Sequence, residues 1–224
     1  MIHHSTVCNF ITVHSALRAC LKNHSRNLHA PLCGIFCPNS VVVARYDALI
    51  EIDLGTVEPM IALPFHPSNA FTIREFKANM ADLLHQVDED AVRQLERKNP
   101  PASLTKKIVN GQFQVDQGVI AGCAGGTYDN IMEAAAILKG RKVADGIRCI
   151  VLPATEEIVQ QMIDEGIFQT FLAAGAAVST PTCGPCLGGH MGCMCEGERC
   201  VSTTNRNFVG RMGHVDSEVY LASP

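Results

Sequence analysis

Gln117-Gly-Val-Ile-Ala-Gly-Cys-Ala-Gly-Gly-Thr127 is the segment from which the architecture of this chain can be inferred. Gln117–Ala121 is short and apolar, which predicts a strand. Residues 122–127 are rich in glycine and predict a loop, while the apolar spacing over residues 130–138 predicts a helix. A strand, a glycine-rich loop and a helix in this order are typical of an α/β domain.

The same rhythm continues toward the C-terminus. Residues 147–153 read as a second strand, and Thr155 is a good N-cap for a helix that extends to about residue 165. A short helix over 168–173 and a brief strand over 176–178 follow. The succession predicts the α/β class, with a three-layer α/β/α arrangement.

Upstream of this domain the sequence is less regular. Residues 41–44 and 49–54 are β-branched and short, which predicts strands, whereas three prolines in residues 58–69 exclude a helix there. Apolar residues at helical spacing predict one helix over 72–98, with Asn79 or Asp82 as a cap within it. We therefore treat residues 41–116 as a partial domain or connector with a proline-rich loop, and 117–224 as the α/β domain.

Residues 1–40 differ in composition from the rest. They are rich in His, Cys, Ser and Asn, and contain no Asp or Glu. This composition resembles an organellar transit peptide and also the product of a misread gene start. We interpret 1–40 as an atypical segment, non-native or disordered. Zinc ligation by Cys33 and Cys37 is the less favoured interpretation.

Charge and hydropathy exclude some classes of protein. The formal net charge is −4, which gives no reason to expect a nucleic-acid partner. No apolar run reaches the roughly 18 residues that span a bilayer. The chain has 11 cysteines, an odd number, and no convincing signal peptide. We expect a cytoplasmic protein whose thiols stay reduced and serve as apolar fillers, metal ligands or nucleophiles.

Cys183-Gly-Pro-Cys186 is the strongest local motif for such chemistry. Its spacing lets two sulfurs converge on one metal or form a redox disulfide. A structural zinc site needs four ligands, and three further cysteines nearby supply them: Cys193, Cys195 and Cys200. On spacing alone, zinc and redox chemistry both stay open.

Cys123 adds a third thiol to this pair. It lies in the glycine-rich loop after the predicted strand Gln117–Ala121, and Cys183 also follows a predicted strand. Open α/β sheets bind ligands at the carboxyl ends of their strands, so the three sulfurs are expected at one sheet edge. Three thiolates on a 4Fe-4S cube leave one iron free to act as a Lewis acid. The alternative for Cys123 is a small buried residue.

A segment rich in Asn and Arg, Ser202-Thr-Thr-Asn-Arg-Asn-Phe-Val-Gly-Arg211, follows the cysteine motif. Arg206 and Arg211 flank a glycine, and Asn205 adjoins them. A guanidinium fork binds a carboxylate bidentately, so these three residues are candidate substrate contacts. The alternative is a solvated surface loop.

Together these motifs resemble the aconitase superfamily, and most closely its large-subunit dehydratases of the 3-isopropylmalate dehydratase type. The resemblance covers Tyr46 to Pro224 and is most specific from Cys183 to Gly213. It implies a 4Fe-4S cluster on Cys123, Cys183 and Cys186, a hydroxy di- or tricarboxylic acid as substrate, and Asn205, Arg206 and Arg211 in the site. The reaction implied is reversible dehydration by a hydro-lyase.

Two features depart from the family pattern. The first cysteine stands in Gly122-Cys-Ala-Gly-Gly126 where Ser-Cys-Thr-Asn is usual, which leaves the substrate open. Family large subunits are also about twice as long, with further domains and a small swivel-domain subunit that carry the other catalytic groups. The chain is thus expected to be a partial large subunit that is inactive alone. The alternative is a non-catalytic iron–sulfur or metal-binding module.

Overall fold

The computed structural model describes residues 50–94 and 103–224. Within it, residues 58–224 belong to one compact unit, and residues 50–57 belong to another. Residues 50–57 contain only the 3-10 turn η1 (Leu54–Thr56), so the strand expected over 49–54 is not found in their described part. Residues 41–44 lie outside the described residues.

One seven-stranded sheet organises residues 58–224. Its strands run in the order β2-β1-β9-β8-β5-β6-β7, and the five from β9 to β7 are mutually parallel. The antiparallel pair β1 and β2 joins the β9 edge. The bounds are β1 (Met60–Ala62), β2 (Ala70–Thr72), β5 (Gln117–Ala121), β6 (Arg148–Leu152), β7 (Ala177–Val178), β8 (Arg199–Ser202) and β9 (Glu218–Leu221). A separate hairpin comprises β3 (Ile108–Val109) and β4 (Gln112–Phe113). The predicted α/β class is confirmed, and the structure shows that the sheet is mostly parallel.

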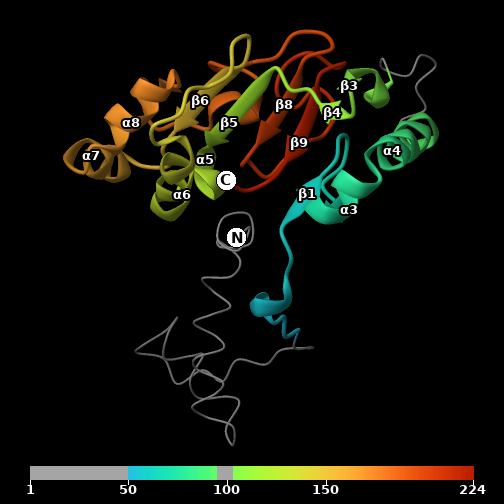
Figure 1. The fold of residues 1–224 in the computed structure, drawn as a ribbon, viewed down its shortest axis with the longest axis horizontal. Coiled ribbons are helices and arrows are strands. Elements are labelled where there is room, and N and C mark those ends of the chain that lie inside the picture. The colour runs from blue at the N-terminus through green and yellow to red at the C-terminus, as the bar shows by residue number, and fades with distance from the viewer. Residues whose placement is uncertain (1–49, 95–102) are drawn as a thin grey trace, which may run out of the picture. The chain divides into compact units, whose positions relative to one another are not determined.

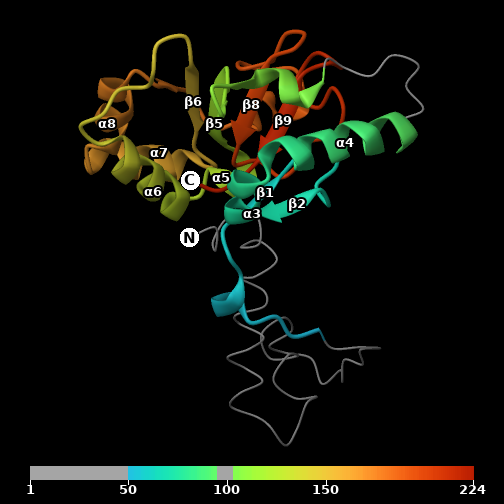
Figure 2. The same ribbon diagram turned by 45° about the vertical axis from the view of Figure 1, so that its right-hand side comes forward.

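The helices pack on one face of this sheet. Alternate strand residues point to opposite faces, so Ile120 and Val151 share the face that packs against α6 (Tyr128–Leu138), α7 (Glu156–Asp164) and α8 (Ile167–Ala174). Val201 and Tyr220 lie on the same face and pack against α3 (Ile73–Ala78) and α4 (Met80–Gln94). Figures 1 and 2 show these two groups of helices at opposite ends of the sheet.

The opposite face carries a second cluster, with Val119, Ile150 and Leu221 from the strands. It is covered by Met194 and Met212, which lie in the irregular chain between β7 and β9. That chain contains only the 3-10 turn η3 (Gly184–Leu187) and strand β8. In the described residues the second outer layer is therefore irregular chain, whereas the sequence predicted a helical one.

Local signals explain most element boundaries. Thr155 caps α7, because its hydroxyl accepts a hydrogen bond from the Ile158 amide at 3.3 Å, as predicted. The helix expected over 72–98 is divided into α3 and α4 at Asn79, whose φ of −130° is not helical. Thr72 and Glu75 form a capping box at the start of α3. No helix in the described part of the chain is both long and apolar enough to cross a bilayer.

Candidate functional site

The predicted site residues lie in segments that leave the carboxyl ends of parallel strands. Cys123 follows β5, Cys183 and Cys186 follow β7, and Asn205 and Arg206 follow β8. Because β5, β6, β7 and β8 are parallel neighbours, these segments begin at the same edge of the sheet. This is the edge at which open α/β sheets bind their ligands.

Cys123 lies in a one-turn helix, α5 (Gly122–Gly125), in the segment that the sequence predicted as a loop. This turn packs directly on the chain after β8. The Ala121 amide donates to the Thr203 hydroxyl at 3.0 Å, and a Cβ on Gly125 would come within 1.8 Å of that oxygen. The glycine is required because nothing larger fits between the two segments. The Cys123 side chain itself is exposed.

Cys183 immediately precedes a tight 3-10 turn, η3, and Cys186 lies within it. Its start is fixed by the Thr182 hydroxyl, which accepts a hydrogen bond from the Gly184 amide at 3.0 Å. The Cys186 amide donates to the Cys183 carbonyl at 3.2 Å, which closes the turn. Cys183 is exposed, whereas Cys186 is half-buried and packs against the cluster around Leu152 and Met212.

Both cysteine-bearing turns contact Leu152 at the end of β6. A Cβ on Gly126 would lie 2.6 Å from the Leu152 carbonyl oxygen, and a Cβ on Gly184 would lie 2.9 Å from a Leu152 methyl carbon. One residue thus supports the turns that carry Cys123 and Cys183. The two turns are neighbours over the same strand end.

The predicted substrate contacts Asn205, Arg206 and Arg211, which we call the carboxylate clamp, differ in their exposure to solvent. Asn205 and Arg206 are exposed, and Arg211 is partly buried. The Arg211 carbonyl lies 3.2 Å from the position of a Cβ on Gly188, so this arginine adjoins the end of the cysteine turn. Its buried Nε has no hydrogen-bond partner among the described residues. A buried donor of this kind is suited to an acceptor that a ligand would supply.

The described residues contain no group of three or more His, Cys, Asp or Glu side chains placed to hold a metal ion. Neither a zinc site nor the set of Cys123, Cys183 and Cys186 is therefore preformed in this part of the chain. The other cysteines suit structural roles: burial raises the pKa of Cys200 to about 12 and also raises that of Cys149. Cys193 and Cys195 are exposed and precede β8, at the other edge of the sheet.

The donor chemistry at the carboxyl edge fits an iron–sulfur cluster. Fe–S clusters take cysteine thiolates, and three thiols stand here on two adjoining turns. The Arg211 backbone adjoins the end of the turn that carries Cys186, and its buried Nε is an unpartnered donor. Hydrogen bonds to the sulfurs are one of the means by which proteins tune such clusters.

Comparison with known proteins shows the family of the chain. The family model described as the aconitase family (aconitate hydratase) matches residues 22–224. The chain belongs to the aconitase family. The match starts within the atypical segment 1–40 and includes all six predicted site residues. The family resemblance predicted from the sequence is confirmed.

The curated relatives are dehydratase subunits. The chain is 49% identical over 181 residues to the 3-isopropylmalate dehydratase large subunit of Clostridium botulinum (strain Alaska E43 / Type E3). Identity is 48% to the same subunit of Acetivibrio thermocellus and 45% to that of Moorella thermoacetica. Each match covers 81% of this chain and 35% of the relative. The chain thus spans about a third of the length of these relatives, and it is similar to the large subunit of a hydro-lyase.

Sequence reasoning missed two polar residues at this edge. Thr203 is buried, and its hydroxyl accepts a hydrogen bond from the Ala121 amide. This bond links β5 to the segment after β8. Asn207 is also buried and binds backbone carbonyls far away in the sequence. Both were part of the quoted Asn- and Arg-rich segment, but their partners are 82 and 144 residues distant, so no local pattern indicated them.

Proposed function

We propose that this chain is the cluster-binding part of an iron–sulfur hydro-lyase of the 3-isopropylmalate dehydratase type, with the three-layer iron–sulfur domain fold of that family. Its reaction is the reversible dehydration of a hydroxy di- or tricarboxylic acid. One observation carries the proposal: the segments bearing three cysteines and an arginine pair leave one edge of a parallel sheet, in a chain of the aconitase family.

Cys123, Cys183 and Cys186 would hold a 4Fe-4S cluster, whose iron without a protein ligand supplies a Lewis acid for substrate oxygens. The chain's own contribution is to fix the thiols on two short turns. Arg206 and Arg211 would each bind a substrate carboxylate through the guanidinium fork. Asn205 would donate its amide to a substrate oxygen. These contacts orient the hydroxy acid before any bond breaks.

The remaining catalytic groups are expected from protein outside this chain. The match covers only 35% of the relative, and the relatives are named large subunits, which supports further domains and a small, swivel-domain subunit as partners. General acid and base groups belong to those parts in this proposal. The complete enzyme is expected to be cytoplasmic, and the chain alone is not expected to turn over substrate.

Conservative substitution of the arginines tests the carboxylate clamp. We expect the chain, purified without oxygen, to bind malate as a simple hydroxy dicarboxylate. Arg206→Lys and Arg211→Lys should each weaken binding at least about tenfold, because lysine lacks the bidentate fork. Isothermal titration calorimetry measures this.

Arg141→Lys is the matched control, since Arg141 is exposed beyond the end of α6 and lies outside the proposed site. Its dissociation constant should equal that of the unmodified chain. Equal affinity in all three variants, or no malate binding by the unmodified chain, would contradict the clamp. A chain that holds a cluster but has no carboxylate affinity would instead be a non-catalytic iron–sulfur module.

A further inference from the structure

The segment that carries Asn205 and Arg206 is fastened to a distant part of the chain. Asn207, which directly follows Arg206, is only 1% exposed. Its side-chain amide donates to the Leu63 carbonyl at 2.6 Å and to the His66 carbonyl at 3.5 Å. Asn205 and Arg206 are exposed, and neither makes a hydrogen bond to any described residue. Their position therefore depends on the backbone that Asn207 holds.

The carbonyls that accept the hydrogen bonds from Asn207 belong to a turn after β1, which we call the Phe65 turn (residues 63–66). Phe65 has a φ of +99°, a conformation that non-glycine residues rarely adopt, and it is buried. Its backbone forms an isolated bridge with Phe208. The His66 ring meets the Phe208 ring edge-on, with the centroids 5.4 Å apart. Together with the two hydrogen bonds from Asn207, four contacts thus join this turn to residues 207 and 208.

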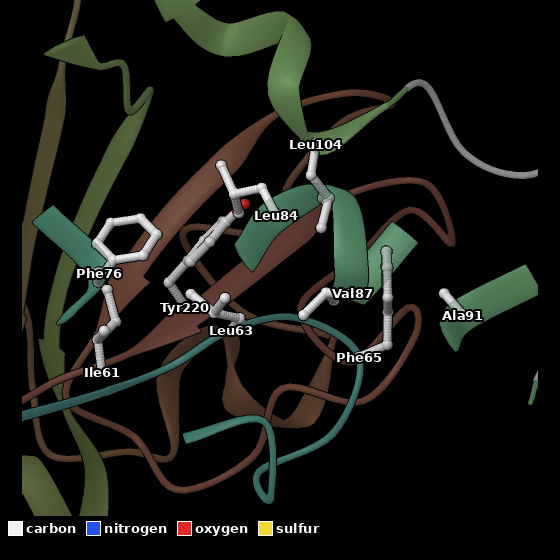
Figure 3. Packing of buried hydrophobic residues seen from close by; sticks show 9 residues of the cluster. All are labelled: Ile61, Leu63, Phe65, Phe76, Leu84, Val87, Ala91, Leu104 and Tyr220. Atoms are coloured by element: carbon white, nitrogen blue, oxygen red, sulfur yellow. The ribbon is translucent and has the colours of Figure 1, made fainter. Parts of the chain in front are cut away.

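The Phe65 turn is itself rigidly held. Leu63 and Phe65 are buried in the cluster that α4 forms with the sheet, and Figure 3 shows the Phe65 ring beside Val87 of α4. The Leu63 amide donates to the Asn69 carbonyl at 2.8 Å, and the Asn69 side chain donates to the Pro64 carbonyl at 2.9 Å. A strained backbone conformation persists only where the surroundings over-determine it.

We propose that Asn207 is a positioning residue for the substrate-binding pair Asn205 and Arg206, and that the Phe65 turn is the fixed support against which it acts. The inference rests on the proposed function, because it assigns these two exposed residues to carboxylate binding. Long side chains bind a ligand well only when their backbone is held in place before the ligand arrives. Asn207 does this for Arg206 without touching the ligand itself.

Truncation of Asn207 tests the assignment in the malate titration. Asn207→Ala should raise the dissociation constant at least about tenfold, since Arg206 loses its fixed backbone. Gln117→Ala is the matched control. Gln117 is also fully buried and donates to a distant backbone carbonyl, that of Gly192 at 2.7 Å, but it lies at the amino end of β5. Its dissociation constant should change less than twofold.

Two further variants separate positioning from general loss of structure. Phe208→Leu removes the ring contact with His66 at a residue that is 42% exposed, so the chain should stay folded and lose affinity by about threefold. In a chain that already carries Arg206→Lys, adding Asn207→Ala should raise the dissociation constant for malate by clearly less than tenfold. Both changes act on the same contact, so their effects should not add.

The possible outcomes separate the positioning role of Asn207 from the proposed carboxylate binding by the arginines. If Arg206→Lys weakens malate binding while Asn207→Ala and Phe208→Leu leave it unchanged, the positioning role is wrong and the clamp stands. If Asn207→Ala and Gln117→Ala weaken binding equally, the effect is one of stability and the positioning role is wrong. If the unmodified chain does not bind malate, the proposed clamp and the inference built on it both fail.

Discussion

Replacing Arg199 with leucine is expected to lower the free energy of unfolding by about 3–5 kcal/mol. Arg199 is fully buried, and its Nε donates to Glu218 at 2.6 Å, while its Nη2 donates to the Leu104 carbonyl at 2.6 Å. Its guanidinium also lies 4.5 Å from the Phe113 ring centroid. Leucine leaves a buried carboxylate and a buried carbonyl without this donor. Urea unfolding followed by circular dichroism measures the loss.

The loss should depend on pH in a defined direction. Burial raises the pKa of Glu218, and the hydrogen bond from Arg199 opposes that rise. In Arg199→Leu the folded-state pKa should rise further above the unfolded value. The part of the penalty that comes from the Glu218 charge is therefore absent below the folded-state pKa of Glu218 in the unmodified chain, which already lies above the ordinary glutamate value. It grows as the pH rises through that pKa toward the still higher one of the variant.

Arg148→Leu provides the comparison for this ion pair. Arg148 and Glu198 are 2.8 Å apart, but the Arg148 side chain is 48% exposed. Its loss should cost about 1 kcal/mol, because solvent screens an exposed pair. If Arg199→Leu costs no more than Arg148→Leu, the buried network does not anchor the sheet to Leu104 as described.

Gly125→Ala is expected to lower the free energy of unfolding by about 3 kcal/mol, which is the upper end of the usual range for an overpacked residue. The added Cβ would lie 1.8 Å from the Thr203 hydroxyl oxygen and 2.5 Å from the Thr203 carbonyl oxygen. A backbone atom cannot swing aside as a flexible side chain does, so α5 must move away from the segment after β8. The turn that carries Cys123 would then no longer pack against Thr203. Thermal unfolding of the variant measures the destabilisation.

Gly118→Ala is the matched control within the preceding strand. A Cβ on Gly118 meets nothing within 4 Å, so this change should be neutral or slightly stabilising. Equal melting temperatures for Gly125→Ala and Gly118→Ala would show that α5 is not packed on Thr203.

The part of the fold that could be predicted from sequence is the part with local signals. β5, α6, β6 and α7 were each expected within a few residues, because apolar spacing and the Thr155 cap lie within single segments. The position of Cys123 after a strand followed from the same pattern. The carboxyl-edge origin of all three cysteine segments then follows from the parallel order of the strands.

Nonlocal features could not be predicted in the same way. β8 and β9 are only four residues each, and their place in the sheet depends on pairing with β5 and with each other. The pairing of β1 with β9 joins the proline-rich segment to the main sheet through one register pair, Ala62 with Leu221. The glycine-rich stretch forms the turn α5, and the amide just before it donates to Thr203, which is 82 residues away. Asn207 has a role only once the Phe65 turn is in place.

Analysis of iron, acid-labile sulfide and zinc in the chain purified without oxygen tests whether the three thiols hold a cluster. We predict about four iron and four sulfide per chain, with broad visible absorption. Cys123→Ser should abolish both, whereas Cys195→Ser, at an exposed thiol before β8, should keep them. Stoichiometric zinc without iron, or a cluster that survives Cys123→Ser, would contradict the account.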